Sequence, residues 1–349
     1  MRVTEFSVHF DIAFVKGRAT VFAVALVLRM RILTVGKNDA GQRLDKFLTK
    51  AVRGLPMSLM YKFIRTKKIK VNRARTTQNY VLCQGDEVQL FIREEFFDSP
   101  EKDSGALGRI VPKLDIVYED ENIMLLNKRP GVLVHEDTEG ADNTLIMHVK
   151  AYLYGKGEYD LENEQSFAPA LCNRIDRNTG GIVIAAKNAE ALRVMNEKIK
   201  NDELSKFYLC AVHGTPNPAK AELHGYLRKN SAENMVEVRE SYFSGAKEII
   251  TRYKTLAKKN GNSLLEIELV TGRTHQIRAH MAFIGHPLLG DGKYGTNRDE
   301  KRRGYKHQAL YAYRLVFDKT GKDTPLSYLE GKEFQIQKEN VWFLREFSE

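Results

Sequence analysis

The stretch NRIDRNTGGIVIAAKN, residues 173–188, carries the two signals on which the fold and the function of this chain depend. Its second half, from the Gly-Gly pair onward, is an apolar run that predicts a buried strand. Its first half places Asp176 between Arg174 and Arg177, just before a Thr-Gly-Gly turn. Taken alone, Asp176 has an ordinary interpretation as a turn residue bonded to its arginine neighbours. The alternative is a carboxylate placed to do chemistry, and the rest of the chain decides between them.

Strand patterns outnumber helix patterns on both sides of this stretch. The segment 114–131 predicts two short strands around an acidic turn, and 206–214 and 263–272 predict further strands from their branched and aromatic content. The segment 188–201 predicts an amphipathic helix with Leu192, Met195 and Ile199 on one face. The elements do not alternate as regular βαβ units. We therefore expect an α+β fold, with a mixed, mainly antiparallel sheet in a domain spanning residues 113–349.

Residues 32–95 predict a separate small module. Leu44, Phe47, Leu48 and Ala51 share one face of a helix over 43–52. A second helix is expected to begin after Pro56, with Ser58 as its N-cap. A short strand around Ile69 and Val71 and a closing strand with Val88, Leu90 and Ile92 follow. Residues 96–112 are rich in Ser, Gly and Pro, which indicates a linker.

Positive charge is concentrated in this module. The whole chain has 349 residues and a formal net charge of +10, which favours a polyanionic partner such as nucleic acid or an anionic membrane surface. A run of cations without an intervening acid covers the second helix and the turn after it: Lys62, Arg65, Lys67, Lys68, Lys70, Arg73 and Arg75. The ordinary interpretation is a solvated lysine-rich helix. Concentration around one element favours a surface that binds the phosphates of a nucleic acid.

Composition also bounds location and cofactors. With 42% apolar and 29% charged residues, the chain is typical of a soluble globular protein. Its three cysteines form no Cys-x-x-Cys pair, which fits a reducing, cytoplasmic location. No metal-binding spacing, phosphate loop or Gly-x-Gly-x-x-Gly occurs, so no metal or cofactor is predicted. Nothing in the pattern demands more than a monomer.

The first residues need an interpretation of their own. Residues 20–28 are apolar but are too few to span a bilayer, which takes about 20. Met30 opens a segment that looks like a natural protein start. We expect residues 1–31 to be a start-site extension without a fold of its own, and no membrane association. A weak secretion signal is the alternative.

The module resembles a known RNA-binding family. R-L-D-K-F-L, the basic helix, I-K-V-N and G-D-E-V occur in the order found in the small RNA-binding module shared with small-subunit ribosomal protein four. One departure is Asn72-Arg73, where that family usually has Asn-Gly. The resemblance implies an RNA-binding role for Lys62, Arg65, Lys67, Lys68, Lys70 and Arg73.

The larger domain resembles the RluA-type pseudouridine synthases. Four stretches carry the resemblance in order and spacing: NKRPGVLVHED (127–137), NRIDRNTGGIVIAAKN (173–188), KFYLCAVHG (206–214) and VTGRTHQIRAHMAFIGHPLLGDGKYG (270–295). The family's usual H-R-L-D-x-x-T-S-G has Asn173, Ile175 and Gly180 here in place of His, Leu and Ser. With the basic module in front, the similarity is greatest to enzymes that act on large-subunit ribosomal RNA.

The resemblance assigns roles to individual residues. Isomerising uridine breaks a glycosidic bond and rejoins the base through carbon 5, so an ionised carboxylate is needed at the sugar. By resemblance this is Asp176, held ionised by Arg273, while Tyr208 stacks on the base and is a candidate general base. Arg174 matches a position that faces the RNA and helps to hold out the flipped nucleotide. Lys128 and Arg278 match basic positions that support the pocket or backbone, and we assign them to RNA binding.

Two alternatives stay open at this stage. One is a pseudouridine synthase that acts on transfer RNA, because the motifs do not report the substrate. The other is an RNA-binding ribosome-assembly factor with an inactive catalytic domain, which the substitutions around Asp176 keep possible. A glycoside hydrolase is disfavoured, since it needs two carboxylates across the scissile bond.

Overall fold

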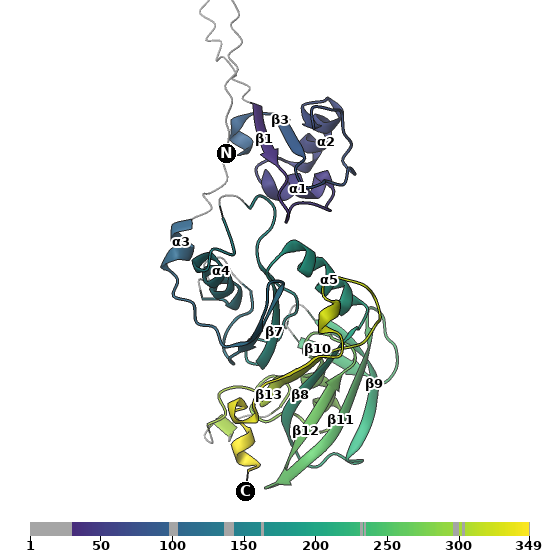
Figure 1. Cartoon of the computed structure of the whole chain (residues 1–349). Coiled ribbons are helices and arrows are strands. Elements are labelled where there is room, and N and C mark those ends of the chain that lie inside the picture. Colours follow the sequence, from purple (N-terminus) through teal and green to yellow (C-terminus); the bar gives the residue numbers. More distant parts are fainter. Residues whose placement is uncertain are drawn as a thin grey trace, which may run out of the picture. The chain divides into compact units, whose positions relative to one another are not determined.

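A computed structural model describes residues 30–97, 104–135, 143–161, 164–230, 233, 235–295, 300–301 and 304–348 (Figure 1). The chain divides into two compact units. Unit 1 ends at Arg109 and also includes residues 156–168, and unit 2 comprises residues 110–155 and 169–349. Residues 1–29, the greater part of the predicted extension, lie outside the described residues. No helix in the described ranges is both long enough and apolar enough to cross a membrane.

Unit 1 contains the predicted basic module, built from a small antiparallel sheet in the order β1-β3-β2 and its helices. The elements are β1 (Met30–Thr34), α1 (Leu44–Ala51), α2 (Met57–Arg65), β2 (Ile69–Val71), β3 (Glu87–Phe91), the 3-10 helix η1 (Glu94–Phe96) and α3 (Ser104–Arg109). The helical face predicted over 43–52 is confirmed, because Leu44, Phe47 and Leu48 are buried in the core of the module. Both helices and both predicted strands are therefore present.

Three boundaries in unit 1 differ from the sequence prediction. Met30 and Arg31 pair with Phe91 and Leu90, so the module begins two residues before the predicted boundary. The prediction of Ser58 as N-cap is wrong, because Pro56 occupies that position and Ser58 lies inside α2. Proline is favoured near a helix start because it lacks the N–H that would remain unsatisfied there. The predicted linker is not uniformly irregular, since it contains α3.

A segment expected in the catalytic domain belongs to unit 1. The backbone N–H of Ser166 donates to Asp39 Oδ1 over 3.1 Å, and Gln42 Nε2 donates to the Ser166 hydroxyl oxygen over 2.6 Å. The side-chain amide of Gln165 also donates to the carbonyl of Thr34 over 2.8 Å. These polar contacts join residues distant in sequence, so no local pattern could predict them.

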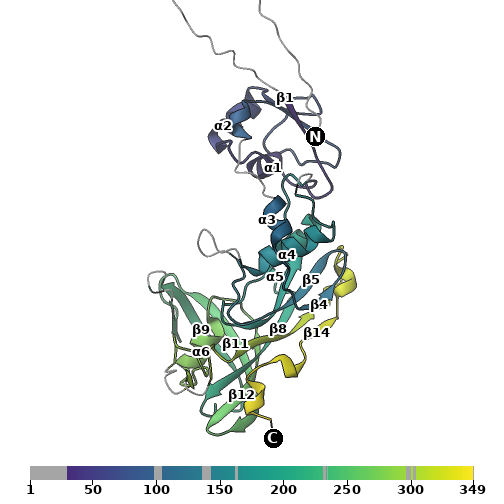
Figure 2. The same cartoon turned by 90° about the vertical axis from the view of Figure 1, so that its left-hand side faces the viewer.

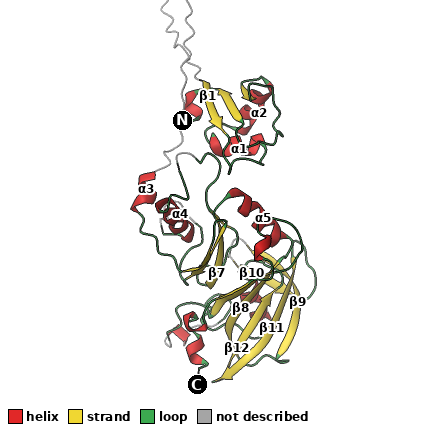
Figure 3. Cartoon of the chain, viewed as in Figure 1, coloured by secondary structure: helices red, strands yellow, loops and turns green. Residues whose placement is uncertain are grey.

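Unit 2 is dominated by one large sheet, which Figure 3 shows as yellow strands. Within the described residues it has eleven strands, in the order β10-β9-β11-β12-β8-β13-β7-β5-β4, with β14 on β13 and β6 on β7. Its strands are β4 (Ile116–Glu119), β5 (Ile123–Lys128), β6 (Ala170–Leu171), β7 (Gly180–Ala186), β8 (Leu204–His213), β9 (Lys220–Asn230), β10 (Met235–Arg239), β11 (Lys247–Lys259), β12 (Asn262–Leu269), β13 (Leu310–Phe317) and β14 (Glu333–Gln335). Its helices are α4 (Leu145–Gly155), α5 (Ala189–Lys200), α6 (Gln276–Phe283) and the 3-10 helices η2 (Ser327–Leu329), η3 (Lys338–Asn340) and η4 (Leu344–Glu346). The described pairings are antiparallel except β7 with β13, which confirms the predicted mixed α+β class.

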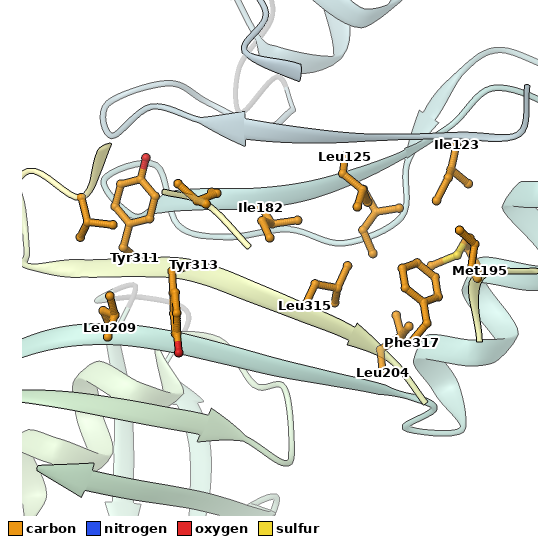
Figure 4. Packing of buried hydrophobic residues seen from close by; sticks show 14 of the residues in the cluster. Ile123, Leu125, Ile182, Met195, Leu204, Leu209, Tyr311, Tyr313, Leu315 and Phe317 are labelled. Carbon is orange, nitrogen blue, oxygen red and sulfur yellow. The ribbon is translucent and has the colours of Figure 1, made fainter. Parts of the chain in front are cut away.

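The core of unit 2 lies where the middle strands meet α5. Met195 of α5, Leu204 of β8 and Phe317 of β13 pack together in Figure 4. The Asn188 side chain caps α5 by accepting a hydrogen bond from the Ala191 N–H over 2.8 Å. All seven residues of β7 are buried, which confirms the strand predicted from the Gly-Gly run.

The Gly-Gly pair permits the parallel contact of β7 with β13. A Cβ at Gly181 would lie 2.2 Å from the carbonyl oxygen of Ala312, and Gly181 adopts a φ of +117° that disfavours any side chain. A Cβ at Gly180 would lie 2.4 Å from the ring of Tyr311. Gly180, where the resembled family usually has serine, therefore leaves the space that the Tyr311 ring fills. The tyrosine hydroxyl in turn donates to Asn127 Oδ1 over 2.7 Å.

Helix α6 lies against the β9, β10 and β11 end of the sheet (Figure 2). Ile277 and Met281 of α6 are buried in a cluster with Tyr208, Tyr253 and Ile267. This packing fixes one face of α6 toward the sheet. The third residue of the helix, Arg278, is thereby also buried.

Candidate active site

Asp176 lies in a loop between β6 and β7 that is tied down at both ends. On the N-terminal side, the Asn173 side chain accepts a hydrogen bond from the Ile184 N–H over 2.8 Å. On the C-terminal side, the Thr179 N–H donates to the Asp176 carbonyl over 3.0 Å. Ile175 packs against the cluster that contains Tyr208 and Ile277. The packing of Ile175 and the two hydrogen bonds position Asp176, and none of these contacts involves its carboxylate.

The carboxylate of Asp176 pairs with Arg278. Arg278 Nη1 donates to Asp176 Oδ2 over 2.8 Å, and 26% of the Asp176 side chain remains exposed. Arg278 also binds Asp291 through Nε at 2.7 Å and Nη2 at 2.8 Å. The Asp291 side chain is fully buried. One guanidinium therefore joins a buried carboxylate to a partly exposed one.

The electrostatics of the Arg278–Asp291 pair favour the ionised form of both groups. Burial opposes the charge of Arg278, but hydrogen bonding to Asp291 and the charges of Asp291 and Asp176 raise its pKa above the ordinary value. Burial likewise opposes ionisation of Asp291, yet Arg278 and two backbone N–H groups hold its pKa below the ordinary value. The backbone donors belong to Lys293 and Tyr294. Arg278 is thus a permanent cation held on a fixed anion.

The prediction that Arg273 pairs with Asp176 is wrong, because Arg278 does so. The Arg273 side chain is exposed in the loop before α6, and its backbone N–H donates to Gln276 Oε1 over 3.0 Å. Both arginines belong to the same motif, and only the orientation of α6 decides which reaches Asp176. The ordinary interpretation, in which Asp176 bonds to its neighbours Arg174 and Arg177, is also wrong, because the ion pair of Asp176 is with Arg278. The side chains of Arg174 and Arg177 are both exposed.

Lys128 supports the Asp176 loop through hydrogen bonds from its ammonium group. Its Nζ donates to the carbonyls of Val132 (2.9 Å), Arg177 (2.8 Å) and Arg129 (3.1 Å), and only 1% of the residue is exposed. Burial lowers its pKa to about 7, and the charge of Asp176 opposes this effect. Three carbonyls match the three N–H groups of an ammonium. The charged form of Lys128 therefore joins the loop that contains Arg129 and Val132 to the loop that contains Arg177. The structure therefore speaks against direct RNA contact by Lys128, and against it for Arg278, which is engaged with two carboxylates.

Tyr208 lies in the middle of the sheet, paired with Ile267 on β12 and Ala312 on β13. Only 7% of it is exposed. Burial and, to a lesser extent, the charge of Asp176 raise the pKa of its phenol well above the ordinary value. The hydroxyl is therefore protonated at neutral pH, and it is close enough to Asp176 for the carboxylate charge to raise its pKa.

Three residues outside the predicted catalytic set belong to the same site: Asp291, His275 and Tyr294. His275 Nε2 lies 3.8 Å from Asp176 Oδ2, and its Nδ1 is 2.8 Å from the Tyr294 hydroxyl. Burial lowers the pKa of His275, so its ring is neutral at pH 7. The Val236 N–H donates to the hydroxyl oxygen of Tyr294. The Tyr294 hydroxyl is therefore left to donate its hydrogen to His275 Nδ1. The signal available in the sequence was the GDGKYG segment, which supplies both Asp291 and Tyr294.

The predicted RNA-binding cations of unit 1 are at its surface. Lys62, Arg65, Lys67, Lys68 and Arg73 are exposed and Lys70 is half-buried. Lys68 lies over the Phe63 ring and Lys70 over the Phe91 ring, with Nζ 5.3 and 5.5 Å from the ring centroids. Within the described ranges, none of the six forms an ion pair with a carboxylate. In the same ranges, no cluster of three or more His, Cys, Asp or Glu residues is placed to hold a metal.

Comparison with known proteins identifies the family. The sequence model of RNA pseudouridylate synthases matches residues 122–283, which include Asp176, Tyr208 and Arg278. An uncharacterised RNA pseudouridine synthase of Mycoplasma genitalium is 34% identical over 293 residues, or 82% of this chain and 88% of the relative. Ribosomal large subunit pseudouridine synthase C of Escherichia coli is 31% identical over 306 residues, or 84% and 90%.

A solved structure shows the same fold. Human RNA pseudouridylate synthase domain containing 4 superimposes with a TM-score of 0.50 at 21% identity, covering 66% of this chain and 92% of the human one. The chain belongs to the RluA-type family of RNA pseudouridine synthases.

Proposed function

We propose that this protein isomerises uridine to pseudouridine in large-subunit ribosomal RNA, with Asp176 as the catalytic carboxylate. The observation that carries the assignment is the chain Asp291–Arg278–Asp176. Its buried end is closed by two charge-assisted hydrogen bonds and its other end opens to solvent. Such an arrangement leaves one oriented carboxylate, with 26% of its side chain exposed, accessible to a substrate. The ribosomal substrate is suggested by the names of relatives such as the Escherichia coli enzyme.

The geometry explains how Asp176 is prepared for reaction. Two bonds to Asp291 hold the Arg278 guanidinium, so Nη1 meets Asp176 without having to be ordered during the reaction. That bond engages Oδ2. Among the described residues no hydrogen-bond donor engages Oδ1, which can face the sugar either as a nucleophile or as a base. A preorganised cation orients the carboxylate in both routes.

Tyr208 acts on the extruded base. A uridine inside a helix must be flipped out at a cost of about a few kcal/mol, and an aromatic face offers compensating stacking. Since the phenol of Tyr208 is protonated at neutral pH, it enters the reaction as a hydrogen-bond donor or stacking surface. The exposed Arg174 and Arg273 are proposed RNA contacts around the extruded nucleotide.

The same observations weigh on the two alternatives. A catalytically inactive assembly factor is disfavoured, because the substitutions at Asn173, Ile175 and Gly180 leave the Asp176–Arg278 pair in place. The Asn173 and Ile175 side chains still anchor the loop. Transfer RNA as substrate is not separated from ribosomal RNA by the site.

The test is tritium release from RNA labelled at carbon 5 of uridine. Large-subunit ribosomal RNA and pooled transfer RNA are assayed in parallel. Release from ribosomal RNA alone supports the proposal, and release from transfer RNA alone transfers the activity to the other substrate class. If neither naked RNA nor isolated large-subunit particles release tritium, the assembly-factor alternative gains.

A triple substitution tests the role of unit 1. Replacing Lys67, Lys68 and Lys70 with alanine should weaken RNA binding, because three phosphate-neutralising charges are lost. The slope of log binding constant against log salt should become shallower by about two for a single-stranded RNA. Binding to oligouridine is measured at several salt concentrations. An unchanged slope would remove these lysines from the RNA interface.

Arg73 offers a second test, because its backbone is strained. Asn72 and Arg73 have φ values of 50° and 66° in a tight turn between Val71 and Ala74, a conformation in which glycine is preferred. Arg73→Gly should stabilise unit 1 by about 0.5–1 kcal/mol, since relief of strain exceeds the added chain entropy. It should also weaken RNA binding. Chemical denaturation and oligouridine binding measure the two effects, and stabilisation without a loss of affinity would contradict an RNA contact.

A further inference from the structure

Arg177, the residue after Asp176, is held in a fixed orientation by the neighbouring loop. The Gly131 N–H donates to the Arg177 carbonyl over 2.9 Å, and Arg177 Nε donates back to the Gly131 carbonyl over 3.1 Å. Lys128 Nζ binds the same Arg177 carbonyl. The backbone and the near end of this side chain are therefore both positioned.

The far end of the Arg177 side chain is left available. Its Nε is used by Gly131, whereas within the described residues neither Nη group has a hydrogen-bond acceptor or carboxylate. The residue is exposed. An exposed arginine is ordinarily mobile and solvated, whereas the Nε bond to Gly131 restricts the direction in which the rigid, planar guanidinium presents its two Nη groups.

Positive charge converges at this place. His307 approaches Gly131, so that a Cβ built on that glycine would lie 3.6 Å from its ring. Burial lowers the pKa of His307, and the charges of Lys128, Lys306 and Arg177 lower it further, with no carboxylate among the causes. Several cations therefore lie around Gly131, although the charge of Asp176 also acts on one of them, Lys128. This excess of positive charge favours binding of an anion.

We propose that the two Nη groups of Arg177 bind a backbone phosphate of the substrate RNA, next to the nucleotide on which Asp176 acts. The planar guanidinium fork matches two phosphate oxygens, and the charge of Lys306 also acts on His307 beside Gly131. Because Arg177 adjoins Asp176 in the chain and Lys128 holds its carbonyl, the contact sets the position of the RNA strand relative to the carboxylate. This inference rests on the proposed RNA-modifying function.

Three variants separate charge, geometry and background. Arg177→Ala removes the phosphate contact, Arg177→Lys keeps the charge but loses the fork, and Arg345→Ala removes one exposed arginine from the C-terminal 3-10 helix as the matched control. Binding of the full-length variants to oligouridine is measured against salt. Arg177→Ala should flatten the salt slope by about 0.7, the value for one phosphate contact on a single strand. Arg177→Lys should keep the slope with a weaker affinity.

Neutral phosphate analogues test the contact directly. Oligouridines carrying a methylphosphonate at one linkage are compared with unmodified RNA. For the wild type, one modified linkage should lower affinity as much as Arg177→Ala does, and the variant should be indifferent to that same modification. A salt slope unchanged in Arg177→Ala, or equal losses in variant and wild type at every linkage, would overturn the proposal.

The experiment also distinguishes this proposal from the catalytic one. Binding is read without turnover, so a wild type that isomerises no RNA but passes the methylphosphonate test keeps the phosphate contact and loses the proposed reaction. If Arg177 only holds the loop, Arg177→Ala should lower thermal stability and the turnover number and leave the salt slope unchanged. In that case the phosphate contact is rejected.

Discussion

Asp176→Asn is expected to lower the turnover number by about 10²–10⁴-fold or more, because the amide can neither attack the sugar nor accept its proton. RNA affinity should remain unchanged, since the substitution alters neither the basic surface of unit 1 nor the exposed arginines of unit 2. Stability should change little as well. Arg278 keeps its two bonds to Asp291, so no buried charge is left without a partner.

Tritium release and oligouridine binding are measured on the same preparation, with thermal unfolding as a check of integrity. Asp323→Asn, an exposed acid in the segment before η2, is the matched control and should be fully active. Retained turnover in Asp176→Asn would remove Asp176 from the reaction. Lost RNA binding or a large fall in melting temperature would instead assign it a structural role.

Arg278→Met should have two separate effects, inactivation and destabilisation. Turnover falls because Asp176 loses the cation that orients its carboxylate. The free energy of unfolding falls by about 3–5 kcal/mol, since the fully buried Asp291 is left without its partner. On this prediction Arg278 contributes to stability through Asp291 and to turnover through Asp176.

A second substitution separates these effects. Arg278→Met combined with Asp291→Asn removes the unpaired charge and keeps an oxygen for the N–H groups of Lys293 and Tyr294. Stability should recover in large part while turnover stays absent. Urea unfolding and tritium release measure the two quantities, and recovery of both together would show that Arg278 acts only through the fold.

The pH dependence of stability supplies an independent signature. In the wild type the pKa of Asp291 is lowered below its ordinary value, so its contribution is fully present above the ordinary carboxyl pKa, about 3.9, and is lost as pH falls through the lowered value. In Arg278→Met the lowering effect of the guanidinium is lost, and only the two backbone N–H groups still oppose burial, which raises the pKa of Asp291. The unfolding deficit of the variant should therefore shrink on acidification. A deficit independent of pH would contradict an uncompensated Asp291.

The sequence by itself determined the elements and the kind of site. Apolar periodicity is a local property, so it predicted α1, α5, β7 and the sheet class correctly. The order of the four motifs predicted that Asp176 and Tyr208 belong to one active site of the pseudouridine synthase type. The same local reasoning failed at Ser58, because Pro56 and Ser58 both satisfy helix-start rules and only the path of the chain selects between them.

Tertiary structure decided which charges meet. Arg273 and Arg278 have the same chemistry in one motif, and the packing of Ile277 and Met281 against the sheet turns Arg278 toward Asp176. Lys128 was assigned to RNA binding at a position that supports the pocket or backbone, and burial and three loop carbonyls direct it inward. Asp291 binds Arg278 on another element, and the segment 156–168 packs in unit 1 with residues more than a hundred positions earlier in the chain. Side-chain direction and long-range pairing depend on how whole elements pack, and no periodicity within a single element encodes them.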